Sequence, residues 1–131
     1  RNGWLDGAAS QGENRSATFF GKPCIANGTA SSGTAGVILY KNLTGLEVGR
    51  SYRFSMLGCT YNGAAPLPQL YLRTDAGNVS AVTTFTAMAW REIALVFVAS
   101  RSSMQMQIVS NVGSGASGND FAMTDCLIED V

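Results

Sequence analysis

The stretch SYRFSMLGCTY, residues 51 to 61, decides the fold class of this chain because polar and apolar side chains alternate at its start. One face carries Tyr52, Phe54 and Met56, and the other carries Arg53 and Ser55. Successive side chains of a β-strand point to opposite faces of a sheet. The pattern therefore predicts a strand with one buried and one exposed face.

Two further segments alternate in the same way, PQLYLRT (68–74) and MQMQIVS (104–110). Their inner faces would hold aliphatic and methionine side chains, namely Leu70, Leu72, Met104, Met106 and Ile108. Their outer faces would hold polar side chains and one tyrosine, namely Gln69, Tyr71, Arg73, Gln105 and Gln107. By contrast, residues 93–98 are apolar at every position, which is typical of a strand covered on both sides.

Short segments rich in β-branched and aromatic residues recur along the chain, and residues that favour turns separate them. Helical periodicity is nearly absent. We expect eight strands, within residues 16–20, 35–40, 51–61, 68–74, 79–86, 90–99, 104–110 and 120–130. This spacing predicts an all-β protein, an antiparallel β-sandwich of the jelly-roll type.

Length and charge limit the number of domains and the kinds of partner. The 131 residues fit one domain, residues 1–131, and the missing initiator methionine suggests a processed product or a piece of a larger protein or assembly. Nine basic and nine acidic side chains cancel, and no run of like charge offers a nucleic acid a binding surface. No apolar stretch approaches the roughly 20 residues of a membrane span, so we expect no membrane insertion.

The chain contains no histidine, which excludes Ser-His-Asp and Cys-His nucleophiles. The acidic residues fall mainly in turns and near the termini, where no pair is placed for glycoside cleavage. We therefore expect no enzyme. The three cysteines, Cys24, Cys59 and Cys126, allow at most one disulfide within the chain, and we expect Cys59 and Cys126 to be small buried hydrophobes.

Three segments resemble carbohydrate-binding modules of the galactose-binding-like jelly-roll type, the group that includes families 4, 9 and 22. They are TGLEVGRSYRFSM (44–56), AWREIALVFVAS (89–100) and NDFAMTDCLIED (119–130). The resemblance covers residues 34–131 and implies the same jelly roll. We interpret Trp90, which opens the second segment, as a large apolar anchor of the core.

The resemblance also implies a structural calcium ion that joins the first and last strands. In this chain the paired acids of the family become Thr124 and Asp125, so Asp125 is the candidate metal ligand, with Asp6 or Glu13 as partners. In a regular strand Asp125 would lie on the same face as Phe121, a poor place for an unpaired carboxylate. We therefore expect either a bulge or a partner at Asp125.

The resemblance implies binding of a glycan or polysaccharide by a face that combines polar side chains with an aromatic ring. The candidate carbohydrate-binding residues are Arg53, Gln69, Tyr71, Arg73, Gln105 and Gln107, and Tyr61. A second candidate surface at the loop end combines Trp4, Tyr61 and Asn62 with residues 113–119.

We expect a non-catalytic module that attaches a larger protein or particle to a glycan, outside the cell or on a cell or virion surface. The alternative is a structural module, such as a virion decoration, tail-fibre or adhesin domain, whose partners are other subunits of an assembly. An exposed apolar patch on the outer strands would favour this alternative.

Overall fold

A computed structural model describes residues 2–29, 35–113 and 118–131. It contains one short 3-10 helix, η1 (Ala8–Ser10), and ten strands. The strands are β1 (Leu5–Asp6), β2 (Asn14–Phe19), β3 (Lys22–Gly28), β4 (Gly36–Leu43), β5 (Ser51–Thr60), β6 (Gln69–Thr74), β7 (Thr83–Thr84), β8 (Arg91–Val98), β9 (Met104–Ser110) and β10 (Asp120–Asp130). Within these ranges no helix is long and apolar enough to cross a membrane.

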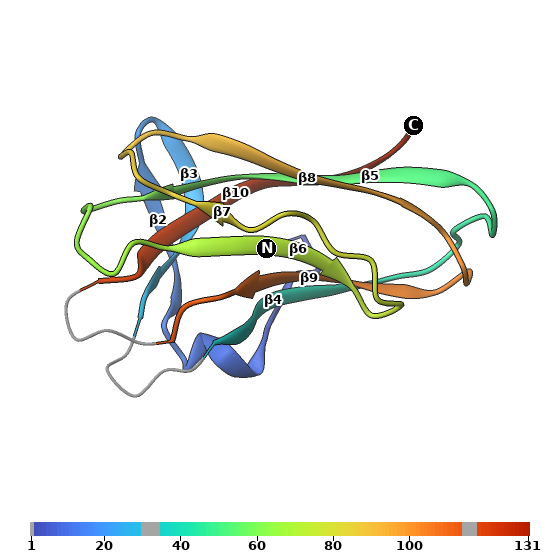
Figure 1. Cartoon of the computed structure of the whole chain (residues 1–131), viewed down its shortest axis with the longest axis horizontal. Coiled ribbons are helices and arrows are strands. Elements are labelled where there is room, and N and C mark those ends of the chain that lie inside the picture. The colour runs from blue at the N-terminus through green and yellow to red at the C-terminus, as the bar shows by residue number, and fades with distance from the viewer. Residues whose placement is uncertain (1, 30–34, 114–117) are drawn as a thin grey trace.

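The strands form two five-stranded sheets in which every pairing is antiparallel. Sheet A has the order β1-β4-β9-β6-β7, and sheet B has the order β2-β3-β10-β5-β8. Figure 1 shows the two layers, with β5, β8 and β10 above β4, β6 and β9. The predicted antiparallel β-sandwich is confirmed, and each of the eight predicted segments overlaps an observed strand.

Two strands, β1 and β3, were not predicted. β3 begins with Lys22 and Pro23, and proline is unusual inside a strand because it has no N–H to donate. The turn before β3 consists of Phe20 and Gly21, which both have positive φ angles, of 48° and 79°. A two-residue hairpin turn with positive φ at both positions normally carries Asn-Gly or Asp-Gly, so Phe-Gly gave no turn signal.

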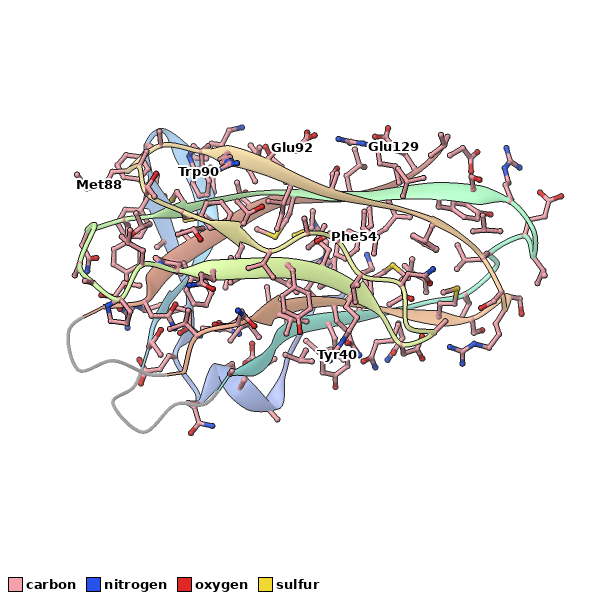
Figure 2. All side chains as sticks on the ribbon, viewed as in Figure 1. Tyr40, Phe54, Met88, Trp90, Glu92 and Glu129 are labelled. Carbon is pink, nitrogen blue, oxygen red and sulfur yellow. The ribbon has the colours of Figure 1, made fainter. Side chains whose placement is uncertain are left out.

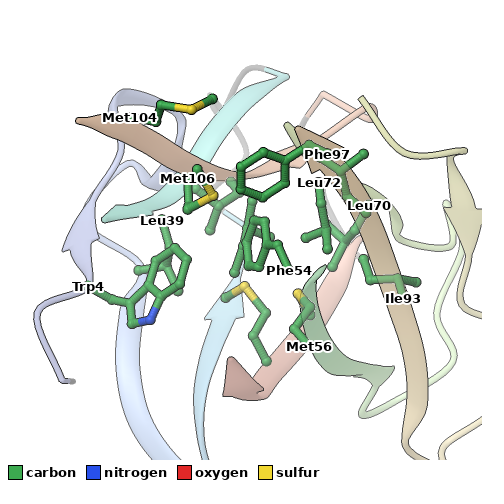
Figure 3. Packing of buried hydrophobic residues seen from close by; sticks show 14 of the residues in the cluster. Trp4, Leu39, Phe54, Met56, Leu70, Leu72, Ile93, Phe97, Met104 and Met106 are labelled. Atoms are coloured by element: carbon green, nitrogen blue, oxygen red, sulfur yellow. The ribbon is translucent and has the colours of Figure 1, made fainter. Parts of the chain in front are cut away.

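The core lies between the sheets and contains the inner faces that alternation predicts. Figure 3 shows Phe54 and Met56 of β5 packed against Leu70 and Leu72 of β6 and against Met106 of β9. All five of these side chains are at most 1% exposed. Trp4, whose exposure the sequence left open, is buried and stacks on Phe54 with ring centroids 5.7 Å apart.

The prediction that residues 93–98 are covered on both sides is wrong. β8 is the edge strand of sheet B and, among the described strands, pairs only with β5. Ile93, Leu95 and Phe97 face the core, whereas Val96 and Val98 are 58% and 52% exposed. A run of apolar residues does not distinguish a doubly covered strand from an edge strand with an apolar outer face.

The final strand, β10, contains the bulge that the position of Asp125 suggested. Its register with β5 shifts between Thr124 and Leu127, and Asp125 has a φ of 51°. In a regular strand Cys126 and Ile128 would face the side opposite Phe121. Because of the bulge, they pack against the same core as Phe121.

Candidate functional site

Polar side chains cover the outer face of sheet A, on the three neighbouring strands β4, β9 and β6. The cross-strand partners Tyr40, Gln107 and Arg73 form one row across these strands. Asn42 lies opposite Gln105, and Tyr71 lies opposite Val109. We call this surface the amide face and define it by Tyr40, Asn42, Gln69, Tyr71, Arg73, Gln105 and Gln107.

A continuous chain of hydrogen bonds links four of these side chains. Arg73 Nε donates to Gln107 Oε1 at 2.6 Å, and Gln107 Nε2 donates to Gln105 Oε1 at 2.8 Å. Gln105 Nε2 then donates to Asn42 Oδ1 at 3.0 Å. Gln107, which lies in the middle of this series of hydrogen bonds, is only 9% exposed, so its amide is held in one orientation. At the other end of the face, Gln69 Oε1 accepts a hydrogen bond from Asn111 Nδ2 at 3.0 Å.

Two half-buried tyrosines, Tyr40 and Tyr71, stand on either side of β9. Neighbouring strands lie about 4.8 Å apart, so about 10 Å separates the backbones of β4 and β6 that carry these rings. In Figure 2 Tyr40 lies beyond the lower layer of strands, away from Glu92 and Glu129 beyond the upper layer. The amide face thus combines aromatic rings with oriented amides, which is what recognition of a sugar needs.

The structure brings together five of the seven predicted binding residues, namely Gln69, Tyr71, Arg73, Gln105 and Gln107. Arg53 does not belong to this group because it lies on β5, on the outer face of sheet B. There it forms ion pairs with Glu92 and Glu129. Alternation showed correctly that Arg53 points outward, but alternation does not say from which sheet.

Tyr61 also lies away from the amide face, next to the β2–β3 hairpin. Its ring stacks on Phe19 with centroids 4.6 Å apart, and both rings pack against a small cluster that contains Cys59. Burial is the main cause that raises the pKa of Tyr61, and the nearby Asp120 carboxylate adds to it. Trp90 packs against the same cluster and donates its Nε1–H to the Phe19 carbonyl at 3.2 Å. Residues 114–117 of the loop-end candidate surface lie outside the described residues.

Tyr40 and Asn42 belong to the amide face but were not among the predicted residues. β4 continues to Leu43, three residues beyond the predicted strand end, and its register with β9 shifts between Val37 and Leu39. This irregularity buries two successive residues, Ile38 and Leu39, and hides the alternation. After Leu39 the alternation of β4 resumes, and Tyr40 and Asn42 point outward. The sequence pattern that marks them therefore starts only after the irregularity.

The surroundings of Asp125 do not fit a calcium ion. Asp125 Oδ2 lies 2.9 Å from Lys22 Nζ, so an ammonium group already faces this carboxylate. Thr124 Oγ1, at the position of the second acid, donates to the Pro23 carbonyl. In the described parts of the chain, no three or more His, Cys, Asp and Glu side chains are grouped so that they could hold a metal ion. Calcium prefers six to eight oxygen ligands, often several of them carboxylates, whereas the charged partner of Asp125 among the described residues is an ammonium group.

The two other predicted partners in calcium binding have contacts of their own. Asp6 Oδ1 accepts a hydrogen bond from Asn14 Nδ2 at 2.9 Å. Glu13 Oε2 lies 3.9 Å from Arg15 Nη1. A cavity of about 360 Å³ opens beside the β10 bulge, where Trp4, Lys41, Asp125 and Cys126 line it. Among its described lining residues, Asp125 supplies one carboxylate and Lys41 one ammonium group, a charge balance that does not favour a divalent cation.

The fold is shared with several solved structures. The C-terminal domain of EclA, described as a sugar-binding protein, is 28% identical over 98% of this chain and 91% of that domain, with a TM-score of 0.77. The CBM22-1 xylan-binding domain from Paenibacillus barcinonensis Xyn10C is 14% identical over 98% of this chain and 86% of that domain, with a TM-score of 0.69.

A structure of a family 4 carbohydrate-binding module, 14% identical, also covers 98% of this chain and 86% of its own, with a TM-score of 0.60. No family model matches the chain, and no curated protein matches its sequence. The chain therefore has the jelly-roll fold of the carbohydrate-binding modules, as its sequence motifs predicted.

Proposed function

We propose that this protein binds a glycan on its amide face, without cleaving it. The observation that carries the proposal is the hydrogen-bonded chain from Arg73 to Asn42, with Tyr40 and Tyr71 on either side. Sugars present hydroxyl groups in fixed directions and apolar C–H faces, which oriented amides and aromatic rings complement. The likeness in fold to sugar- and xylan-binding domains supports the same function.

The absence of catalysis is part of this proposal. The chain has no histidine, and the described side chains of the amide face include no carboxylate. A glycosidase needs two carboxylates on either side of the bond that it cleaves. Polysaccharides and surface glycans lie outside cells, so the proposed place of action is extracellular, on a cell surface or on a virion surface.

The alternative, an assembly module, is supported less well. Its expected apolar patch is present only in part, because the exposed Val96 and Leu127 on the outer face of sheet B lie close to charged side chains. Arg53, which is paired with Val96 across the strands, bonds to Glu92 and Glu129 there. A protein interface normally has few charged residues at its centre.

A glycan array probed with the protein and with the Tyr71→Ala and Tyr40→Ala variants tests the proposal. We expect both variants to lose about 10-fold or more in affinity, because a stacked ring and its hydrogen bond contribute roughly 1–3 kcal/mol. Both tyrosines are half-buried on an outer face, so the thermal unfolding midpoint should change by less than about 5 °C.

Arg53→Ala is the matched control, because Arg53 lies on the outer face of the other sheet. We expect it to bind the same glycans with unchanged affinity. If the two tyrosine variants bind as well as the unmodified protein, the amide face is not the binding surface. If the unmodified protein binds no glycan at all, the proposed function is wrong.

A further inference from the structure

Arg73 is the only charged member of the amide face, and the structure gives it no negatively charged partner among the described residues. The ion pairs among the described residues involve other basic side chains, namely Arg15, Lys22, Arg50, Arg53 and Arg101. The carboxylate of Asp75, which follows β6, accepts from Arg101 Nη2 and from the backbone N–H of Gln105, both at 2.9 Å. It is therefore balanced by Arg101.

Arg73 also determines the direction of the whole hydrogen-bonded chain. A guanidinium group has five N–H donors and no acceptor, so Gln107 must turn its carbonyl oxygen toward Arg73 Nε. The Gln107 amide nitrogen must then face Gln105, and that of Gln105 must face Asn42. Each of these three amide carbonyl oxygens thus already accepts one hydrogen bond from a neighbouring side chain. The amide N–H groups that no described neighbour uses remain as donors for a ligand.

Toward the described residues, the guanidinium of Arg73 uses only its Nε–H. No hydrogen bond or ion pair joins Nη1 or Nη2 of Arg73 to any described residue. Arg73 is half-buried, so it loses part of its hydration without gaining a carboxylate. Two parallel N–H donors of this kind match the two oxygens of a carboxylate in a bidentate contact.

We propose that the glycan that binds to the amide face is acidic, and that one of its sugar carboxylates pairs with Nη1 and Nη2 of Arg73. This inference rests on the proposed function and adds the chemical class of the ligand. The carboxylate supplies the missing negative charge, and the remaining amide donors bind its neighbouring hydroxyl oxygens. Tyr40 shares a cross-strand row with Arg73, and Tyr71 lies two residues before Arg73 on β6, so both rings border the surface that Arg73 belongs to.

The experiment compares an array of neutral, carboxylate-bearing and sulfated glycans, followed by titration calorimetry on matched polymers. Polygalacturonate and its methyl ester form a suitable pair, because esterification removes the charge and leaves the sugar backbone in place. The carboxylate-bearing ligand that binds most tightly on the array is likewise compared in its free-acid and methyl-ester forms. Affinity for the acidic form should fall as the salt concentration rises, because salt screens the ion pair.

Three variants separate charge from geometry. Arg73→Gln, which removes the charge and keeps a donor, should weaken binding of the acidic glycan about 10- to 100-fold. Arg73→Lys, which keeps the charge and removes the fork, should give an intermediate affinity. Arg53→Gln, which removes the same charge from the other outer face, should leave the affinity unchanged.

The proposal is supported if esterification of the glycan abolishes binding and if Arg73→Gln loses affinity for the acidic form. Neutral glycans as the tightest ligands, or an ester that binds as tightly as the acid, would overturn it and leave the proposed function intact. Sulfated glycans that bind more tightly than carboxylate-bearing ones also contradict the carboxylate assignment. If no glycan of any class binds, both the inference and the proposed function fail.

Discussion

Cys59 and Cys126 show how strongly the interior of this protein affects a single side chain. Burial raises the pKa of Cys59 to about 11, with a smaller contribution from the neighbouring Cys24. Burial also raises the pKa of Cys126 to about 12, and the Asp125 carboxylate adds to the shift. All three cysteines are free thiols; Cys59 is buried as expected, whereas Cys126 is only half-buried.

We expect these thiols to react slowly with a thiol reagent such as DTNB in the folded protein. The thiolate is the reactive form, and a pKa raised from 9.0 to about 11 lowers its amount about 100-fold at pH 8. Cys59, which is fully buried, should react more slowly than the half-buried Cys24. Single Cys→Ala variants assign the kinetic phases, and the denatured protein is the control. A Cys59 that reacts at the denatured rate would contradict its burial.

The same shifts predict a loss of stability at alkaline pH. Folding raises the pKa of Cys59 and Cys126 above 9.0, so the folded state holds these protons more tightly than the unfolded state. Their contribution is complete below pH 9 and is lost as the pH rises through about 11 and 12. Urea unfolding across this range should show a falling free energy of unfolding, with a smaller decline in Cys126→Ala.

At the scale of an element, the bulge in β10 lies where this strand stops pairing with β3, while its pairing with β5 continues on both sides of the bulge. β3 pairs with β10 only from Asp120 to Met123. Beyond that point the two strands remain connected through Thr124, which bonds to Pro23, and through the ion pair of Lys22 and Asp125. The bulge thereby returns Cys126 and Ile128 to the core side of the sheet.

Substitution of Asp125 tests this bulge. A residue other than glycine in the left-handed backbone conformation lowers the free energy of unfolding by about 1 kcal/mol. The Asp125→Gly variant should therefore be more stable than Asp125→Ala by about that amount. Both lose the exposed ion pair with Lys22, which contributes about 0–1 kcal/mol. Asp130→Ala, which loses a comparable ion pair with Arg50, is the control. Chemical denaturation measures all three, and equal stability of the Gly and Ala variants would mean that residue 125 is not left-handed.

At the scale of the whole molecule, the sandwich separates two outer faces with different chemistry. Sheet A presents neutral amides and tyrosines around Arg73, whereas sheet B presents Arg53 between Glu92 and Glu129. Figure 2 shows that Tyr40 lies on the opposite side of the molecule from Glu92 and Glu129. Each face can therefore be changed by substitution without altering the other.

The fold as a whole should not depend on calcium, because Lys22 already balances Asp125. We expect the thermal unfolding midpoint to be the same in excess EDTA and in millimolar calcium. A ligand that binds only the folded state would raise the midpoint. A lower midpoint in EDTA that disappears in Asp125→Asn would restore Asp125 as a metal ligand.

The sequence by itself determined which side chains of most strands face the core. The alternation in β5, β6 and β9 placed Phe54, Leu72 and Met106 inside, because the pleat of a strand has a period of two residues. The three resembling segments also determined the jelly roll. Five members of the amide face followed from the same alternation, which marked Tyr71 and Arg73 as outward residues.

Only the tertiary structure decided which outward residues share a face. Arg53 and Arg73 have the same local pattern, yet strand order places them on different sheets. Tyr40 joined the amide face because an irregularity in β4 changed its parity, and the bulge at Asp125 did the same for Cys126. Strand order and bulges depend on long-range pairing, whereas alternation is local, and for that reason the sequence pattern did not reveal them.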